Sequence, residues 1–90
     1  MSVGIKKAVF DALNDEVGPV HCQYAPGFLH ITGSGTMTVD LQASVPGGDF
    51  EMRKQYTSGA SVVLDRGFLW KAVCSAYTSG TLTVSIGENV

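Results

Sequence analysis

The stretch that decides the fold is Ser-Gly-Thr-Met-Thr-Val-Asp-Leu at residues 34–41, because its Ser-Gly start and its apolar alternation recur along the chain. A second copy reads Tyr-Thr-Ser-Gly-Ala-Ser-Val-Val-Leu at residues 56–64, and a third reads Tyr-Thr-Ser-Gly-Thr-Leu-Thr-Val-Ser-Ile at residues 77–86. Glycine supplies the positive φ of tight turns, and period-two alternation is typical of a half-buried strand. The repeats therefore predict three similar turns that each lead into a strand, rather than three functional sites.

The three copies differ in register. The first and third place apolar residues at equivalent positions: Met37, Val39, Leu41 and Leu82, Val84, Ile86. The middle copy is shifted by one residue, so that either Val62 and Leu64 or Ser61 and Val63 face the core. Because a one-residue slip reverses the buried face of a strand, residues 60–64 are predicted to hold a bulge or to lie at a sheet edge.

Outward from the repeats, the chain from residue 28 onward reads as β-structure. The strand candidates are residues 28–32, 36–45, 50–56, 60–64, 68–77 and 81–86, and a short one at residues 20–24 precedes them. Residues 68–77 are apolar on both faces, which predicts a central strand with Trp70 in the core. About six strands joined by glycine-containing turns predict a mainly β fold, an antiparallel β-sandwich or small barrel spanning residues 28–90.

The N-terminal segment has a different pattern. Ile5, Val9, Leu13 and Val17 are four residues apart, which predicts an amphipathic helix over residues 4–17 that ends at Gly-Pro. Acidic residues near its C-terminal end oppose the helix dipole, so an extended arm is the alternative. Two Gly/Pro pairs in residues 18–27 predict a linker, and the chain divides into a helix or arm with linker (1–27) and the β-domain (28–90).

Composition bounds the function. Charged residues make up 16% of the 90 residues, below the roughly 25% of an average domain, which suits burial in an assembly. The net charge of −2 and the absence of a basic stripe predict no nucleic-acid partner. No apolar run reaches the roughly 18 residues of a membrane helix, and no signal-peptide pattern is seen. We therefore expect a cytoplasmic product with free thiols at Cys22 and Cys74, and no membrane partner.

Residues with catalytic or metal-binding chemistry are few. His21, Cys22, His30 and Cys74 do not have the spacing of a zinc site. The serines of the repeats have no histidine nearby in sequence, and the carboxylates are scattered, so no nucleophile–base or acid–base pair is predicted. We expect no catalytic, metal or cofactor site, and hence no enzyme.

Two stretches carry a resemblance to a known class of protein. Residues 34–49 resemble the first hairpin of small β-sandwich proteins from tailed-bacteriophage virions, and residues 68–86 resemble their closing hairpin. The resemblance implies a capsid decoration protein or a head or tail accessory protein. Such a structural protein would be made in the host cytoplasm, reside in the virion, form a homo-oligomer and bind capsid or tail proteins. The candidate subunit-interface residues are Val3, Ile5, Val9, Phe10 and Leu13, unless that segment packs on its own domain.

Two other functions stay open. A carbohydrate- or receptor-binding β-module would use aromatic residues at loop tips, for which the candidates are Tyr24, Phe28 and Tyr56. A single-stranded nucleic-acid-binding barrel of the OB type would interleave aromatic and basic side chains. The residues available for such a platform are Phe50, Tyr56, Phe68, Trp70 and Tyr77 with Arg53, Lys54 and Lys71.

Overall fold

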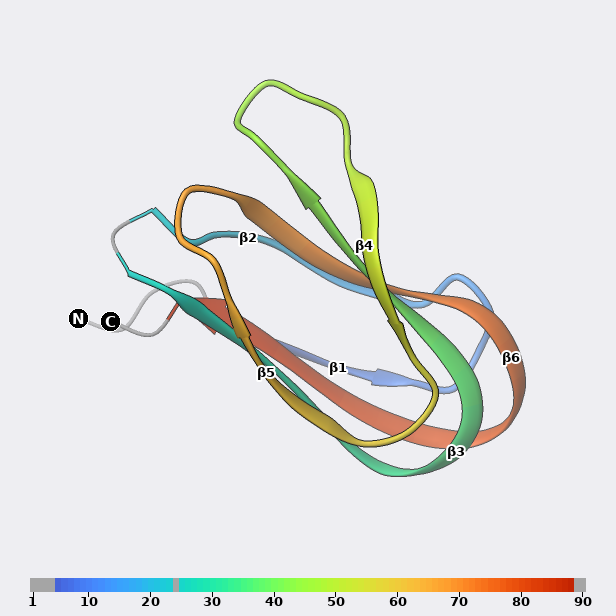
Figure 1. Cartoon of the computed structure of the whole chain (residues 1–90). Coiled ribbons are helices and arrows are strands. Elements are labelled where there is room, and N and C mark those ends of the chain that lie inside the picture. The colour runs from blue at the N-terminus through green and yellow to red at the C-terminus, as the bar shows by residue number, and fades with distance from the viewer. Residues whose placement is uncertain (1–4, 24, 89–90) are drawn as a thin grey trace.

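The computed structural model describes residues 5–23 and 25–88. These residues form six strands: β1 (Lys6–Phe10), β2 (Glu16–His21), β3 (Gly27–Ser44), β4 (Glu51–Tyr56), β5 (Ala60–Leu64) and β6 (Leu69–Glu88). Every pairing is antiparallel and all six strands belong to one open sheet (Figure 1), which confirms the mainly β, antiparallel prediction. The described part of the chain has no helix, and so none that could cross a membrane.

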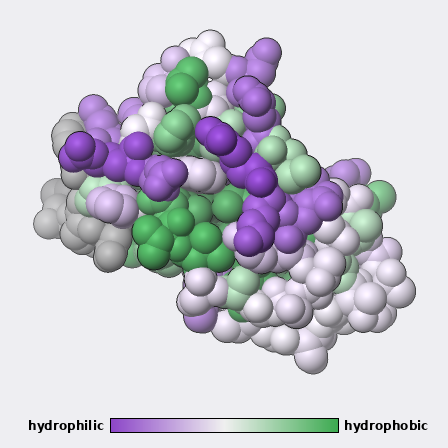
Figure 2. Space-filling view, viewed as in Figure 1, coloured by the Kyte–Doolittle hydropathy of each residue, from purple (hydrophilic) through white to green (hydrophobic). Residues whose placement is uncertain are grey.

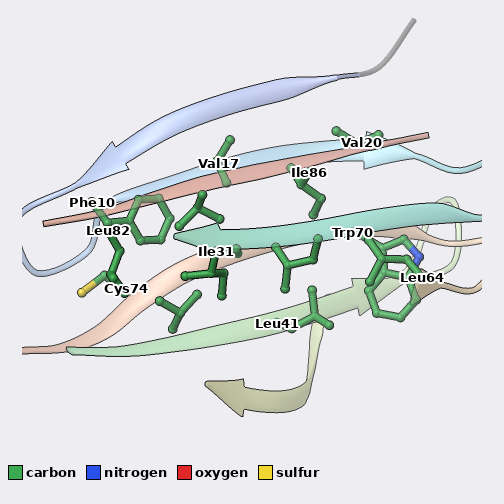
Figure 3. Close-up of a cluster of buried hydrophobic side chains, with 14 of the residues drawn as sticks. Phe10, Val17, Val20, Ile31, Leu41, Leu64, Trp70, Cys74, Leu82 and Ile86 are labelled. Carbon is green, nitrogen blue, oxygen red and sulfur yellow. The ribbon is translucent and has the colours of Figure 1, made fainter. Parts of the chain in front are cut away.

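The two long strands β3 and β6 form the centre of the sheet. They pair with each other from Gly27 opposite Glu88 to Ser44 opposite Leu69. One half of the sheet has the order β1–β6–β3–β5 and is called the first half here; the second half has the order β2–β6–β3–β4. The sheet folds over so that these halves face each other (Figure 1), and buried apolar side chains from both fill the space between them (Figure 3).

The sheet bends sharply at glycines of the repeats. Gly35 of β3 pairs with Gly80 of β6, and φ is +118° at Gly33 and +83° at Gly80. The prediction of turns at residues 34–35 and 78–80 is therefore wrong, because both segments are paired strand, and β3 and β6 each replace two predicted strands. Positive φ lets the backbone bend sharply, while the partner strand keeps the ladder continuous. Residues 57–59 connect β4 to β5, as predicted.

Two bulges near this bend keep the same face of β6 directed into the core on both sides of it. The pairing of β3 with β6 skips Thr78 and then Ser75. One skipped residue would turn all later side chains of β6 to the other face, whereas two restore the original face. Side chains of β6 therefore point into the core on both sides of the fold: Trp70, Ala72, Cys74, Leu82, Val84 and Ile86. Ala76, between the two bulges, is exposed although it continues the every-second-residue spacing of Trp70, Ala72 and Cys74.

The predicted core positions of the repeats are confirmed. Met37, Val39 and Leu41 of the first copy are buried, as are the three apolar residues of the third copy. Strand β5 of the middle copy pairs only with β3 and lies at an edge of the sheet, as its register predicts. Leu64 of β5 is buried, and Val63 on the opposite face is 78% exposed.

The N-terminal segment is strand rather than helix, so the helix prediction for residues 4–17 is wrong. Both β1 and β2 pair with β6, which places the described part of residues 1–27 in the same sheet as the rest of the chain. The turn between them is stabilised by the Asp15 carboxylate, which accepts hydrogen bonds from the amides of Asp11 (2.9 Å) and Ala12 (3.0 Å), and Asn14 has a φ of +71°. Pairing with the long free side of β6 outweighs a helical pattern whose charges oppose the dipole.

Candidate interaction surface

The outer face of the first half of the sheet carries a shallow groove of about 490 Å³. Strand β3 provides its centre, β5 one wall, and the residue before β1 the other. The lining residues are Ile5, Phe28, Leu29, His30, Ser61, Val62, Val63 and Ser85. The groove thus collects residues from four separate parts of the chain.

Cross-strand register explains why the groove is apolar at one end. Phe28 lies opposite Val63 on β5 and opposite Gly87 on β6. Gly87 has no side chain to cover the ring, and Ile5 stands beyond β6 next to the start of β1. Ile5 is 56% exposed and Phe28 is half-buried. With Val63 they form an apolar strip, here the Ile5–Phe28–Val63 strip, across the outer face.

The next row of the groove is polar. His30 lies opposite Ser61 on β5 and opposite Ser85 on β6, and its Nδ1 is 2.8 Å from the Ser61 Oγ. A hydrolytic Ser-His pair needs a third group that orients the imidazole. Among residues 5–23 and 25–88 no carboxylate hydrogen-bonds to His30, and the contact between His30 and Ser61 links β5 to β3. Sequence reasoning missed it because 31 positions separate the two residues and only the strand register joins them.

The predicted subunit-interface residues separate into two groups. Ile5 lies in the groove, and Val9 is 54% exposed on the outward side of β1, opposite Thr83. Leu13, also 54% exposed, is in the turn between β1 and β2. Phe10 points the other way and is completely buried in the core (Figure 3), so it is not available to a neighbouring subunit. Val3 lies outside the described residues.

Of the three predicted loop-tip aromatics, the structure describes Phe28 and Tyr56. Phe28 is in β3 rather than in a loop, where it joins Ile5 in the groove. Tyr56 ends β4 and packs, half-buried, against the core. Tyr24 lies outside the described residues. The structure therefore joins one candidate of each set, Ile5 and Phe28, in a single surface.

The aromatic and basic residues considered for a nucleic-acid platform pair with one another. The Arg53 guanidinium carbon is 5.3 Å from the ring centroid of Phe68, while Lys54 Nζ is 5.7 Å from that of Tyr56. A third pair places Lys71 Nζ 4.6 Å from the Phe50 ring centroid. Trp70 is buried, and its indole Nε1 donates to the Asp65 carbonyl oxygen (2.9 Å). Three of these rings thus already have a cation over one face.

Both cysteines are buried, unpaired thiols, as predicted. Burial raises the pKa of Cys22, and the negative charge of Glu88 adds to the rise. Burial also raises the pKa of Cys74; a hydrogen bond with the Ala76 backbone opposes the rise, and the negative charges of Asp15 and Asp40 add to it. Both thiols therefore stay protonated at neutral pH, the opposite of an activated nucleophile.

These pKa shifts predict a loss of stability in alkaline solution. Between the ordinary thiol pKa of 9.0 and the higher native value, the unfolded chain loses protons that the native chain keeps. The free energy of unfolding is therefore expected to be constant from pH 7 to 8 and to fall above about pH 9. Urea unfolding across this range measures it, and a variant with Cys22→Ala and Cys74→Ala should show a shallower decline. An equally steep decline in that variant would rule the thiols out as the cause.

Comparison with known proteins identifies the fold but no family. No family model matches the chain, and no curated protein matches its sequence. The chain is similar in structure to an oxalate oxidase (TM-score 0.52, 18% identity), with 94% of this chain and 42% of that chain covered. It is also similar to Peruvianin-I, a cysteine peptidase from Thevetia peruviana latex (TM-score 0.53, 13% identity), with 93% and 49% covered. This chain thus spans less than half the length of either protein, and at these identities the similarity extends to the fold alone.

Proposed function

We propose that this chain is a structural protein of a tailed-phage virion, which binds capsid or tail subunits in a decoration or accessory role and stabilises the particle. The observation that carries the proposal is the Ile5–Phe28–Val63 strip on the outer face of the sheet. The side chains of Ile5 and Val63 are 56% and 78% exposed, and the chain as a whole has few charged residues. Contiguous exposed apolar residues mark interaction surfaces. The resemblance of residues 34–49 and 68–86 to virion hairpins supports the choice of partner.

The architecture we propose within this class is a β-sandwich. Its two layers are the facing halves of the one folded sheet, with the core between them. A closed barrel is less well supported, because β4 and β5 pair only with β3 and not with each other. One layer then presents the groove outward while the other half completes the core.

The expected binding energy favours stabilisation of the particle by many bound copies of the chain over a single high-affinity contact. Complete burial of a Val, Ile or Phe side chain contributes about 1.5–3 kcal/mol, and association costs several kcal/mol of translational and rotational freedom. A strip of three such side chains therefore gives a modest affinity for a single subunit. On a particle with symmetric sites the effect repeats at every copy, and each bound copy stabilises the assembled state by mass action.

We infer binding rather than catalysis. Oxidation of oxalate and peptide cleavage belong to the two structurally similar proteins, whose identities of 18% and 13% do not carry an activity over to this chain. Burial and raised pKa at Cys22 and Cys74 weigh against a cysteine nucleophile. In the described part of the chain, no three His, Cys, Asp or Glu side chains gather as a metal-binding group.

The two rival functions have weaker support. Carbohydrate binding by loop-tip aromatics is not favoured by the position of Phe28 within a strand or by the packing of Tyr56 on the core. A single-strand platform needs free aromatic faces and several phosphate contacts. Here Phe50, Tyr56 and Phe68 have basic side chains of the chain itself above their rings.

Gradient sedimentation tests the proposed function. Particles released from cells that carry the gene are banded in a density gradient, and the chain is quantified in each fraction by mass spectrometry. We expect it in the particle fractions, at a fixed ratio to a capsid or tail protein. Recovery of the chain at the top of the gradient alone, with the particles free of it, would refute the proposal.

A further inference from the structure

Four strands of the described sheet pair on one side only, and three of them carry features that hinder pairing with another chain. Strand β1 has Lys6 and Lys7, and strand β2 has Pro19 and an irregular register. Strand β4 also has an irregular register and is highly charged, with Glu51, Arg53 and Lys54. Charges, proline and bulges are the usual protection of sheet edges.

Strand β5 has none of these protections. Its sequence is Ala-Ser-Val-Val-Leu, with regular pairing to β3 over all five residues. The nine residues 56–64 contain no charge and no proline. Alternate residues of an edge strand direct their N–H and C=O groups away from the sheet, where they can accept a further strand. Val63, on the outward face of this edge, is 78% exposed.

The side of the molecule next to β5 is also apolar. Figure 2 shows an apolar area in the hollow between β4 and β5, with hydrophilic side chains on both flanks. Tyr56 at the end of β4 and Val62 in β5 are half-buried apolar residues that pack against the core. A strand added to β5 would therefore lie beside an apolar surface as well as complete the edge hydrogen bonds.

We propose that β5 is a self-association edge, and that its occupant is β5 of a second copy of this chain, paired antiparallel about a two-fold axis at Val62. In this register Ser61 lies opposite Val63 of the second copy, and Val63 lies opposite its Ser61. The two Val63 side chains then approach diagonally across the axis, which covers part of their exposed surface. The first halves of the two sheets become one continuous sheet.

The charge pattern favours a second copy over a foreign strand. In the proposed register Asp65 and Arg66 lie opposite Gly59 and Ser58 of the second copy, so no like charges meet. The contact is isologous: each copy offers the same uncharged edge and covers that of the other, which closes the assembly at two chains. If the occupant were instead a peptide of another protein, every chain without that peptide would keep its uncharged β5 edge exposed. This inference does not rest on the proposed virion function, because it concerns the isolated chain.

Sedimentation equilibrium of the purified chain over a range of concentrations tests the proposal. The wild type should approach twice the chain mass of 9.5 kDa. Val63→Lys should weaken the dimer at least tenfold, because it places two cations diagonally across the axis. Val9→Lys is the matched control, since it makes the same change on the same outer face but at β1, and it should leave the dimer intact. Circular dichroism should show the same fold for all three proteins.

The outcomes separate this inference from the proposed function. A wild type that stays monomeric throughout, a dimer that Val63→Lys leaves unchanged, or one that Val9→Lys weakens equally would each overturn the β5 pairing. A monomer that still bands with particles would overturn the pairing and support the virion role. A dimer that Val63→Lys disrupts, from a chain that never bands with particles, would support the pairing and refute the virion role.

Discussion

Replacement of Gly80 by alanine is expected to lower the free energy of unfolding by about 3 kcal/mol or more, through combined strain and backbone collision. Gly80 has a φ of +83°, and an added Cβ would lie 2.6 Å from both the Gly35 Cα and the Ser34 carbonyl oxygen. Both neighbours are backbone atoms of the paired strand, so no side chain can move aside. To relieve the contact, β3 and β6 would have to separate at the fold in the sheet.

Gly47→Ala is the matched control for this substitution. Gly47 has nearly the same φ, +85°, but an added Cβ would have no atom within 4 Å. It therefore carries the left-handed strain alone, about 1–2 kcal/mol. Urea unfolding of both variants measures the difference. Equal costs at the two glycines would show that the close approach of Gly35 and Gly80 does not determine how the sheet folds over.

Phe10→Ala is expected to lower the free energy of unfolding by about 3–5 kcal/mol, the usual cost of truncating a buried phenylalanine. The Phe10 side chain is fully buried between the halves of the sheet, opposite Leu82 in the register of β1 with β6. The neighbouring Val9 is 54% exposed, so Val9→Ala should change stability by no more than about 0.5 kcal/mol.

This pair of variants distinguishes two roles of the N-terminal segment. If the segment were an arm held ready for a neighbouring subunit, neither residue would contribute to the stability of the isolated chain. Thermal or urea unfolding of the purified variants gives the answer without any partner. A small cost for Phe10→Ala would contradict the placement of β1 in the sheet.

Local patterns in the sequence predict strands well where burial alone determines them. The alternation in residues 36–44 and 81–86 corresponds to buried faces of β3 and β6. The shifted register of the middle copy predicts a bulge or an edge strand, and β5 is an edge strand. The two wrong predictions arise where a distant strand decides the outcome. A Ser-Gly-Thr segment has the same local chemistry in a turn as in a sharply bent strand, and only the pairing of Gly35 with Gly80 selects the second.

The N-terminal error has the same origin. Ile5, Val9, Leu13 and Val17 fit helical spacing, yet three of the four are β-branched and suit a strand once β6 offers a partner. Only some of the residues that line the groove could be predicted from the sequence. Ile5 and Phe28 carry a signal because they are large apolar residues near polar or turn residues, whereas the contact of His30 with Ser61 depends on a long-range register that no local pattern contains.

The most direct test of the account is whether the groove is the surface that binds particles. The fraction of chain that bands with particles is measured for the wild type, Ile5→Lys and Val45→Lys. Ile5 and Val45 are both 56% exposed. Ile5 lines the groove, whereas Val45 lies in the loop that connects β3 to β4, outside the groove. We predict that Ile5→Lys loses most of the particle-bound fraction and Val45→Lys keeps it. Equal binding by both variants, or loss at Val45 alone, would contradict the groove as the binding surface.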